Sequence, residues 1–493
     1  MKLLKVYISA FCMCSLSVLL NSCDDFLKEE PLDMKSSDQF WKTKADAESG
    51  VNALYFGGVP YLHNTDVGGG WTPKATMWGG IVSGLYVDKR KDRTFTTASE
   101  GCNFNIESFD DIAMKYWHEF YKGISRANFV IANIPTMTGV LDEATINNYV
   151  AQGKFFRAYG YFWLVKEFGG VPYISEPYTS TEGMYKERLS AEEVYKKIEA
   201  DLLDIVNGDA LPNKTFYDNG CYVTRAMAQT LLAQVYLQWA GAPLNGGTDY
   251  YGKAAQMALK VINDSPHELI HPNGTTDDLS SAYNVIKTTK SSAEIIYAKE
   301  YNYSDYSVGN SYACRSIGTD AFQWGVFHPG GDVLYNAYLP CDMLLNSYAS
   351  NDIRGHEKQF FFKKYTDAAG KTYTLNNAGN WAWFDENALI SGHDGDYNMP
   401  VFRFAEVLLI AAEGLARTNH EDNAVGGAKY YLNQVRKRAG LADETATGND
   451  LIQSILTERL HELPLEFKIW DDIRRTRLYP EAVSYTHLTL PTT

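Results

Sequence analysis

One stretch of the chain, residues 224–264, constrains the fold more than any other. Its first half places four residues at the spacing of one helix face: Ala228, Leu232, Val235 and Trp239. A loop must follow, because residues 241–248 contain Pro243 and two adjacent glycines. A second helix is predicted to begin near Asp249 and to end before Pro266, since proline cannot continue a helix. The stretch therefore predicts an αα-hairpin, which cannot bury both of its apolar faces without neighbours.

The same pattern of paired helices recurs along the sequence. Further pairs are predicted at residues 44–54 with 116–134, at 149–168 with 191–206, and within 403–440. Gly440 lies where the last helix would end, and glycine readily takes the left-handed conformation that is common there. Such pairs resemble tetratricopeptide repeats, in which each pair buries its neighbour's apolar face; four ordinary hairpins in a bundle are the alternative. We expect a mainly α fold: a tetratricopeptide-like helical-repeat superhelix of about four helix pairs with a large irregular ligand-binding insertion.

The composition argues against a nucleic-acid partner and favours a flat, amphipathic ligand. The 493 residues carry a formal net charge of −15 and no basic run offsets it, so no nucleic-acid partner is expected. Aromatic residues are abundant, with 34 tyrosines, 23 phenylalanines and 10 tryptophans. They suit a surface that binds a flat, amphipathic ligand, although tyrosine is also a common core residue.

The beginning of the chain resembles a bacterial lipoprotein signal. Lys2 and Lys5 precede an apolar stretch, residues 6–20, that is too short to span a bilayer comfortably. The residues ending at Cys23 resemble a lipobox, in which this cysteine becomes the lipidated first residue; a simple secretory signal is the alternative. The acidic residues directly after Cys23 resemble the export tag of surface lipoproteins in the Bacteroidetes. No other segment is apolar for 18 residues, so no membrane-spanning helix is expected.

Five motifs, in order along the chain, resemble those of SusD/RagB-type proteins. They are Trp117 to Asn128, ending in Arg126-Ala127-Asn128; Phe156 to Phe162, followed by Gly169-Gly170-Val171-Pro172; Arg403 to Leu409; Tyr431 to Leu441; and Thr457 to Glu466 with Trp470 to Arg475. The resemblance covers roughly residues 23–480, and the set is specific even though each motif alone is weak.

This resemblance implies a lipoprotein of the outer membrane, lipid-anchored through Cys23 and exposed at the cell surface. It would bind an oligosaccharide or polysaccharide without catalysis or cofactor, and deliver it to a TonB-dependent β-barrel transporter. The motif residues Arg403, Glu406, Arg436 and Arg438 are expected to form internal ion pairs. The implied organisation is a signal peptide at 1–22, a SusD-like N-terminal region with helix pairs at 23–241, a third repeat and connection at 242–290, a RagB/SusD C-terminal region at 291–482, and an uncharged, threonine-rich tail at 483–493 that we expect to be non-native.

Two irregular stretches, residues 61–92 and 300–400, are the predicted ligand-binding regions, because helical repeats carry their insertions on one face. Neither stretch shows sustained helical periodicity, and both are rich in aromatic residues. Sugar rings stack on such side chains through their flat C–H faces. The candidate glycan contacts are Trp71, Trp78, Tyr86, Trp324 and Trp383. For each of them, packing in the core is the alternative.

Catalytic and metal-binding patterns are weak. His461-Glu462 begins like HExxH but has Leu465 where the second histidine must lie, so no zinc helix is expected. The acidic pairs at 385–386 and 394–396 motivate a surface-anchored glycoside hydrolase as the alternative function, and the latter pair lacks the other ligands of a calcium loop. The helix pairs alone also fit a tetratricopeptide-type scaffold for protein partners.

The cysteines after Cys23 are widely spaced, which favours buried free thiols over a metal site.

Overall fold

The computed structural model describes residues 40–56, 80–87, 111–178, 183–271, 279–306, 309–328 and 338–478, and it confirms a mainly helical chain. Every predicted helix is present. The predicted helices are α2 (Lys44–Asn52), continued by the 3₁₀ turn η1 (Ala53–Tyr55), α5 (Asp111–Asn133), α6 (Glu143–Phe168), α7 (Ala191–Asn207), α8 (Arg225–Ala240), α9 (Gly247–Asp264), α14 (Phe404–Ala416) and α15 (Ala428–Arg438). Two further helices, α16 (Gly448–Glu462) and α17 (Ile469–Thr476), complete the C-terminal part.

Local chemistry sets the ends of these helices. The Thr224 side chain accepts a hydrogen bond from the Met227 amide at the start of α8, and Ser190 forms a capping box with Glu193 at the start of α7. Each side chain thereby satisfies an amide that has no partner inside the helix. At the other end of the repeats, Gly440 has φ of 78°, as predicted for a left-handed residue after α15.

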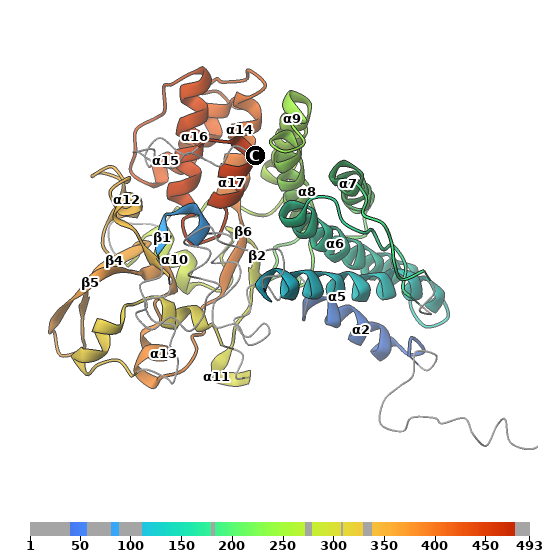
Figure 1. The fold of residues 1–493 in the computed structure, drawn as a ribbon, viewed down its shortest axis with the longest axis horizontal. Helices are drawn as coiled ribbons and strands as arrows, with labels where there is room; N and C mark the ends of the chain where they lie inside the picture. Colours follow the sequence, from blue (N-terminus) through green and yellow to red (C-terminus); the bar gives the residue numbers. More distant parts are fainter. Residues whose placement is uncertain are drawn as a thin grey trace, which may run out of the picture.

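The helices pack side by side in a curved array (Figure 1). On α6, Gly153 and Gly160 let α5 approach closely: a Cβ at Gly153 would lie 2.9 Å from the Ile131 side chain, and one at Gly160 would lie 2.9 Å from Ile124. Helix α8 is buried on nearly all sides, so it is the central element of the repeats and has no solvent face. The hairpin formed by α8 and α9 therefore buries its apolar faces against neighbouring helices, as the sequence pattern required.

Helix α9 joins the N-terminal and C-terminal helices. Every residue of α14 is buried, and Gly414 on α14 lies against Tyr251 and Ala255 of α9. A Cβ at Gly414 would lie only 2.5 Å from the Tyr251 carbonyl oxygen, so the two backbones are in direct contact. This contact continues the array of helices from α9 into α14, α15 and α16.

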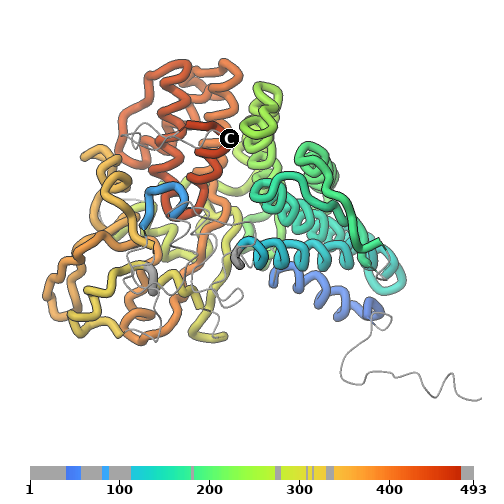
Figure 2. The backbone as a smooth tube through the Cα atoms, in the orientation of Figure 1, coloured from blue at the N-terminus to red at the C-terminus, as the bar shows by residue number. Residues whose placement is uncertain are grey.

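The irregular insertion is closed at its base by a two-stranded sheet. Strand β2 (Ile295–Lys299) pairs antiparallel with β6 (Met399–Arg403), and Ile295 faces Arg403. The chain between them, which matches the predicted stretch 300–400, forms a separate lobe beside the helices α14–α17 and away from α5–α7 (Figure 2). This lobe contains a β-hairpin that was not predicted, β4 (Phe361–Thr366) with β5 (Thr372–Asn380), and short helices. Strand β3 (Leu339–Pro340) pairs with β1 (Tyr86–Val87) from the other predicted stretch.

The motif arginines form buried ion pairs, as predicted. Glu462 accepts contacts from Arg403, Arg438 and Arg354, and Glu294 pairs with the first two of these arginines. Burial by itself would raise the pKa of Glu462, but the arginines outweigh burial and lower the pKa. Since Glu294 directly precedes β2, this cluster fastens the base of the insertion to α15 and α16.

The other two predicted internal pairs are also present. Arg436 Nη1 lies 3.6 Å from Glu458, and Lys468 Nζ lies 3.1 Å from Glu406.

In the described ranges, no helix combines the length and the apolar character that crossing a membrane requires.

Candidate functional site

The five sequence-predicted contacts do not come together at one place. Trp71 and Trp78, like the lipidation candidate Cys23, lie outside the described residues. Tyr86 is in β1, is 1% exposed, and stacks on Tyr338 with ring centroids 4.3 Å apart. Its hydroxyl donates to the Pro464 carbonyl oxygen. The prediction for Tyr86 is therefore wrong: a ring with no open face cannot stack on a sugar.

Trp383 is also a core residue. It ends the 3₁₀ turn η9 (Trp381–Trp383), is 6% exposed, and packs against Tyr312, Tyr338 and Phe467 with centroids 4.8 to 5.8 Å away. These rings belong to one apolar cluster between the insertion and α16 and α17. Its predicted role as a sugar contact is likewise contradicted, because burial against this cluster covers the indole.

Trp324 is the candidate that keeps an accessible ring. It ends the 3₁₀ turn η7 (Thr319–Trp324), where Gly325 takes φ of 69°, and it is half-buried. Its indole is parallel to Tyr373, with centroids 4.8 Å apart and planes 19° apart, and also parallel to Tyr365 at 6.2 Å and 8°. Tyr365 and Tyr373 are cross-strand partners in β4 and β5. The hairpin thus holds the indole flat across two neighbouring tyrosines, an arrangement that we call the Trp324 platform.

Polar groups surround the Trp324 platform. Lys371 Nζ lies 4.5 Å from the centroid of the Tyr373 ring, and the Tyr373 hydroxyl donates to Asp367 Oδ2 at 3.0 Å. The amide of Lys371, together with other donors, holds the pKa of Asp367 below its usual value. The Tyr365 hydroxyl donates to Glu386, at the start of α13 (Glu386–Ser391), and burial raises the pKa of this tyrosine above its usual range. The arrangement presents an aromatic plane bordered by an ammonium group and a carboxylate.

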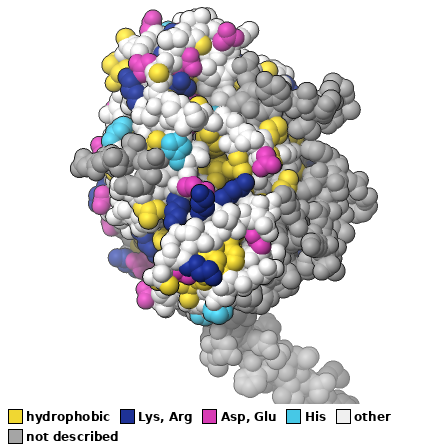
Figure 3. Space-filling view, turned by 90° about the vertical axis from the view of Figure 1, so that its left-hand side faces the viewer, with side chains coloured by type: hydrophobic (Ala, Val, Ile, Leu, Met, Phe, Trp, Pro, Cys, Tyr) yellow, Lys and Arg dark blue, Asp and Glu magenta, His cyan; other side chains and the backbone are white. Residues whose placement is uncertain are grey.

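The surface on this side of the molecule mixes apolar and basic groups. Figure 3, which views the side of β4 and β5, shows hydrophobic side chains at the surface between rows of lysine or arginine side chains. Lys363 and Lys364 of β4 and Lys371 before β5 are exposed. Such a mixed surface fits a ligand that offers both apolar faces and hydroxyl groups.

The acidic pairs that suggested catalysis have structural roles. Asp385 caps α13 by accepting from the Ala388 amide, and it also accepts from the Asp396 amide at 3.0 Å. Asp396 in turn accepts from the amide of Tyr303 and the hydroxyl of Ser304. Within the described residues, no cluster of three or more histidine, cysteine, aspartate or glutamate side chains could hold a metal ion. These carboxylates fasten loops to one another.

His461 and the described cysteines are the remaining residues for which the sequence analysis considered a chemical role. His461 is 6% exposed and stacks on Tyr348 with centroids 4.3 Å apart, and burial lowers its pKa well below the usual value. Cys221 and Cys341 are free thiols, and they are half-buried where the sequence predicted burial.

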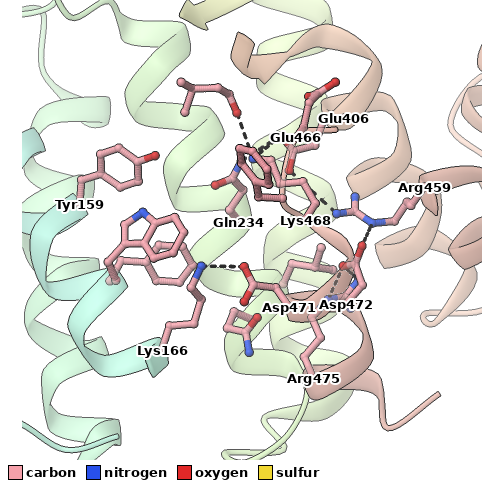
Figure 4. A pocket seen from close by; sticks show the side chains of 16 residues that line it. Tyr159, Lys166, Gln234, Glu406, Arg459, Glu466, Lys468, Asp471, Asp472 and Arg475 are labelled. Carbon is pink, nitrogen blue, oxygen red and sulfur yellow. Dashed lines mark hydrogen bonds and ion pairs between the residues drawn. The ribbon is translucent and has the colours of Figure 1, made fainter. Parts of the chain in front are cut away.

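A hollow lies between the N-terminal and C-terminal helices, where α6 and α8 face α14, α16 and α17 (Figure 4). Its volume is about 60 Å³, and charged groups border it: Lys166 with Asp471, Lys468 with Glu406, and Arg459 and Arg475 with Asp472. A site of this size holds a few water molecules and no sugar ring. The hollow is therefore part of the contact between the two halves and is too small to be a glycan site.

Sequence reasoning proposed Trp324 as a contact but did not identify the residues that position its ring. The segment from Phe361 to Leu375 contains two runs rich in aromatic and β-branched residues around Gly370, and this is a usual hairpin signal. In the structure Gly370 has φ of 82° at this turn. Recognising the hairpin would have placed Tyr365 opposite Tyr373, and so would have identified the support under the indole.

The fold and this surface define a class of protein: a helical-repeat scaffold that carries an irregular lobe with a half-buried aromatic platform. Two family models match the chain, "SusD family" over residues 322–488 and "Starch-binding associating with outer membrane" over residues 81–237. A curated relative, SusD-like protein P2 of Formosa agariphila, is 27% identical over 485 residues, which cover 94% of this chain and 89% of the relative. The chain belongs to the SusD/RagB family.

Solved structures agree with this assignment. A SusD superfamily protein from Parabacteroides distasonis matches with a TM-score of 0.76 and 26% identity, over 90% of each chain. Surface glycan-binding protein A from Bacteroides thetaiotaomicron, solved in complex with laminarihexaose, matches with a TM-score of 0.67 and 22% identity, over 88% of this chain and 90% of that chain. The second likeness shows a shared fold.

Proposed function

We propose that this protein binds glycans at the cell surface without cleaving them, and delivers them to a TonB-dependent β-barrel transporter. The observation that carries the binding step is the Trp324 platform, an indole held flat over Tyr373 beside Lys371 and Asp367. A sugar can stack its C–H face on the outer side of the indole while its hydroxyl groups bond to the neighbouring charged groups. A relative of the same fold has been solved with a glucan hexasaccharide, laminarihexaose, which supports a glycan as the class of ligand.

The absence of catalysis is part of the proposal. Glycoside hydrolysis needs two carboxyl groups that face each other across the scissile bond. The acidic pairs of the lobe instead accept hydrogen bonds from nearby amides and hydroxyls, as Asp385 and Asp396 do. Lipid attachment at Cys23 and delivery to a transporter are supported by the signal-like N-terminus and by family membership.

The binding step is tested with the chain from Asp24 onward, which lacks the lipid. Native gels cast with starch, laminarin, xyloglucan or other polysaccharides would show which glycan retards the protein, and the same mixtures would be assayed for new reducing ends. Retardation without released sugar is expected. Released sugar would replace this proposal with a hydrolase, and no retardation by any polysaccharide would favour a scaffold for protein partners.

Anchoring and delivery need separate experiments. The full chain is expected in the membrane fraction, and Cys23→Ser is expected to move it to the soluble fraction. A β-barrel transporter is expected to copurify with the lipidated chain after mild detergent extraction. Copurification of no barrel would remove the delivery step and leave glycan binding in place.

A further inference from the structure

Lys287 precedes β2 in the chain and is placed unlike the lysines of the lobe. It lies in the last turn of α10 (Ala282–Thr288), is half-buried, and has three aromatic rings around its ammonium group. Its Nζ is 4.1 Å from the centroid of Trp381, 5.1 Å from Tyr397 and 5.8 Å from Phe384. In the described part of the chain, no carboxylate lies within ion-pair distance of this nitrogen and no acceptor bonds to it. The rings remove water from the amine without supplying a counter-charge.

This environment favours the neutral amine. Desolvation penalises the charged form of a lysine, and the ring faces recover only part of the lost hydration. Asp385 and Glu386 at the start of α13 act in the opposite direction from a distance, while the charge of Lys358 adds to the effect of burial. Burial dominates and lowers the pKa of Lys287 to about 7. About half of the molecules then carry an uncharged, nucleophilic amine at neutral pH.

Lys287 also borders a cavity. The cavity has a volume of about 60 Å³, and its other lining groups include Tyr283, Trp383, Asn310 and Asn398. At about 10–15 Å³ for each water-sized group, it has room for roughly four non-hydrogen atoms. A two-carbon aldehyde such as glycolaldehyde has that number. The Asn310 amide nitrogen donates to the Tyr397 carbonyl oxygen, and the Asn398 amide nitrogen donates to Glu300, so these side chains hold the wall of the cavity in place.

From the caging rings, the missing counter-charge and the adjoining cavity, we propose that Lys287 is a covalent capture site for small aldehydes. Its Nζ attacks the carbonyl carbon, an N–C bond forms and the C–O bond breaks. The carbonyl oxygen leaves as water with the two protons of the amine, and a neutral imine remains. No oxidant or reductant takes part in this condensation. The inference is independent of glycan binding, because Lys287 borders the cavity beside Trp383 and is not part of the Trp324 platform.

The test uses the folded full chain at pH 7 with glycolaldehyde. Cyanoborohydride in the same solution transfers hydride to the imine carbon and so makes the adduct permanent for peptide mass spectrometry. Lys371 is the matched control, because its Nζ also lies over an aromatic ring, Tyr373, at 4.5 Å, but the residue is exposed. Lys287 is expected to be labelled at least about tenfold faster than Lys371.

Two further measurements, the pH dependence of labelling and the effect of urea, show whether the folded environment of Lys287 causes its faster labelling. The labelling rate at Lys287 should rise between about pH 6 and 8 and then level off, whereas the rate at Lys371 should still be rising at pH 9. In urea the preference should vanish, because the cage and the cavity exist only in the folded chain. Equal rates in the folded protein, or a preference that persists after unfolding, would overturn the proposal. Neither measurement requires a variant that has to fold.

Discussion

Lys166 Nζ lies 2.6 Å from Asp471 Oδ2 and joins α6 to α17 across 305 residues of chain (Figure 4). The same ammonium group lies 3.4 Å from the centroid of the Trp163 ring, and next to it Arg474 Nη2 lies 3.1 Å from Glu167. Burial would raise the pKa of Asp471, but Lys166 and Arg474 outweigh burial and lower it. These contacts connect the repeat helices of the N-terminal part to the C-terminal end of the described chain.

Removing one partner of the Lys166–Asp471 pair should destabilise the protein. Asp471→Ala removes the nearer carboxylate of a buried ammonium group and leaves only Glu167, 3.9 Å away, so the expected loss is roughly 3 kcal/mol in the free energy of unfolding. Lys166→Met should cost less, because methionine keeps the packing against Trp163. Urea unfolding of both single variants and the double variant measures the coupling, expected at roughly 1–3 kcal/mol. Additive single effects would show that the pair contributes nothing beyond packing.

Gly414 should be intolerant of alanine. In an ordinary helix the substitution would stabilise by up to about 1 kcal/mol. At Gly414, however, the new Cβ would lie 2.5 Å from the Tyr251 carbonyl oxygen and 2.8 Å from Ala255 Cβ, so α9 and α14 must separate. We expect Gly414→Ala to destabilise by roughly 1–3 kcal/mol.

Gly252 on α9 is the matched control for that substitution. A Cβ there would meet only the Thr418 methyl group at 3.8 Å, an ordinary contact. Gly252→Ala should be neutral or stabilising by up to about 1 kcal/mol in the same urea experiment. If the two variants had the same stability, backbone contact between α9 and α14 would not be the determining factor.

Glu413 should make stability depend on acid pH. Burial opposes its charge, but Arg475, Arg417 and Arg459 outweigh burial and lower the pKa from 4.5 to about 2. Because the folded pKa lies below the unfolded one, the stabilisation is present above pH 4.5 and is lost as the pH falls from 4.5 towards 2. The shift corresponds to roughly 3 kcal/mol. Glu413→Gln should lower stability at pH 7 and flatten the stability–pH curve between pH 4.5 and 2; an unchanged slope there would contradict the assignment.

Trp324 should contribute to ligand binding without supporting the fold. Trp324→Ala is expected to weaken glycan binding by roughly 1–3 kcal/mol, or about 5- to 150-fold in Kd, since aromatic anchors typically contribute this much. Tyr185→Ala serves as a control, because Tyr185 is fully exposed and lies outside the lobe. Isothermal titration with the glycan found in the gel screen gives the affinities, and circular dichroism checks folding. An unchanged Kd with native folding would exclude Trp324 as a contact.

Glycan contacts were harder to predict than helices. Trp324, Tyr86 and Trp383 lie in the two irregular stretches and looked equivalent in the sequence. Tyr86 became a core residue because Pro464, 378 residues away, supplies the acceptor for its hydroxyl and Tyr338 covers its ring. Trp324 stayed partly exposed although its indole stacks on Tyr373 of the β4–β5 hairpin.

The sequence by itself determined the helix pairs and most of their ends. Helical hydrogen bonds join residues four apart and caps such as Thr224 act within one turn, so this information is local. Only the tertiary structure decided which aromatic side chains reach the surface, where Lys287 finds its cage, and how Lys166 meets Asp471. The physical reason is that burial and desolvation depend on groups brought together from distant parts of the chain, and no local pattern records those neighbours.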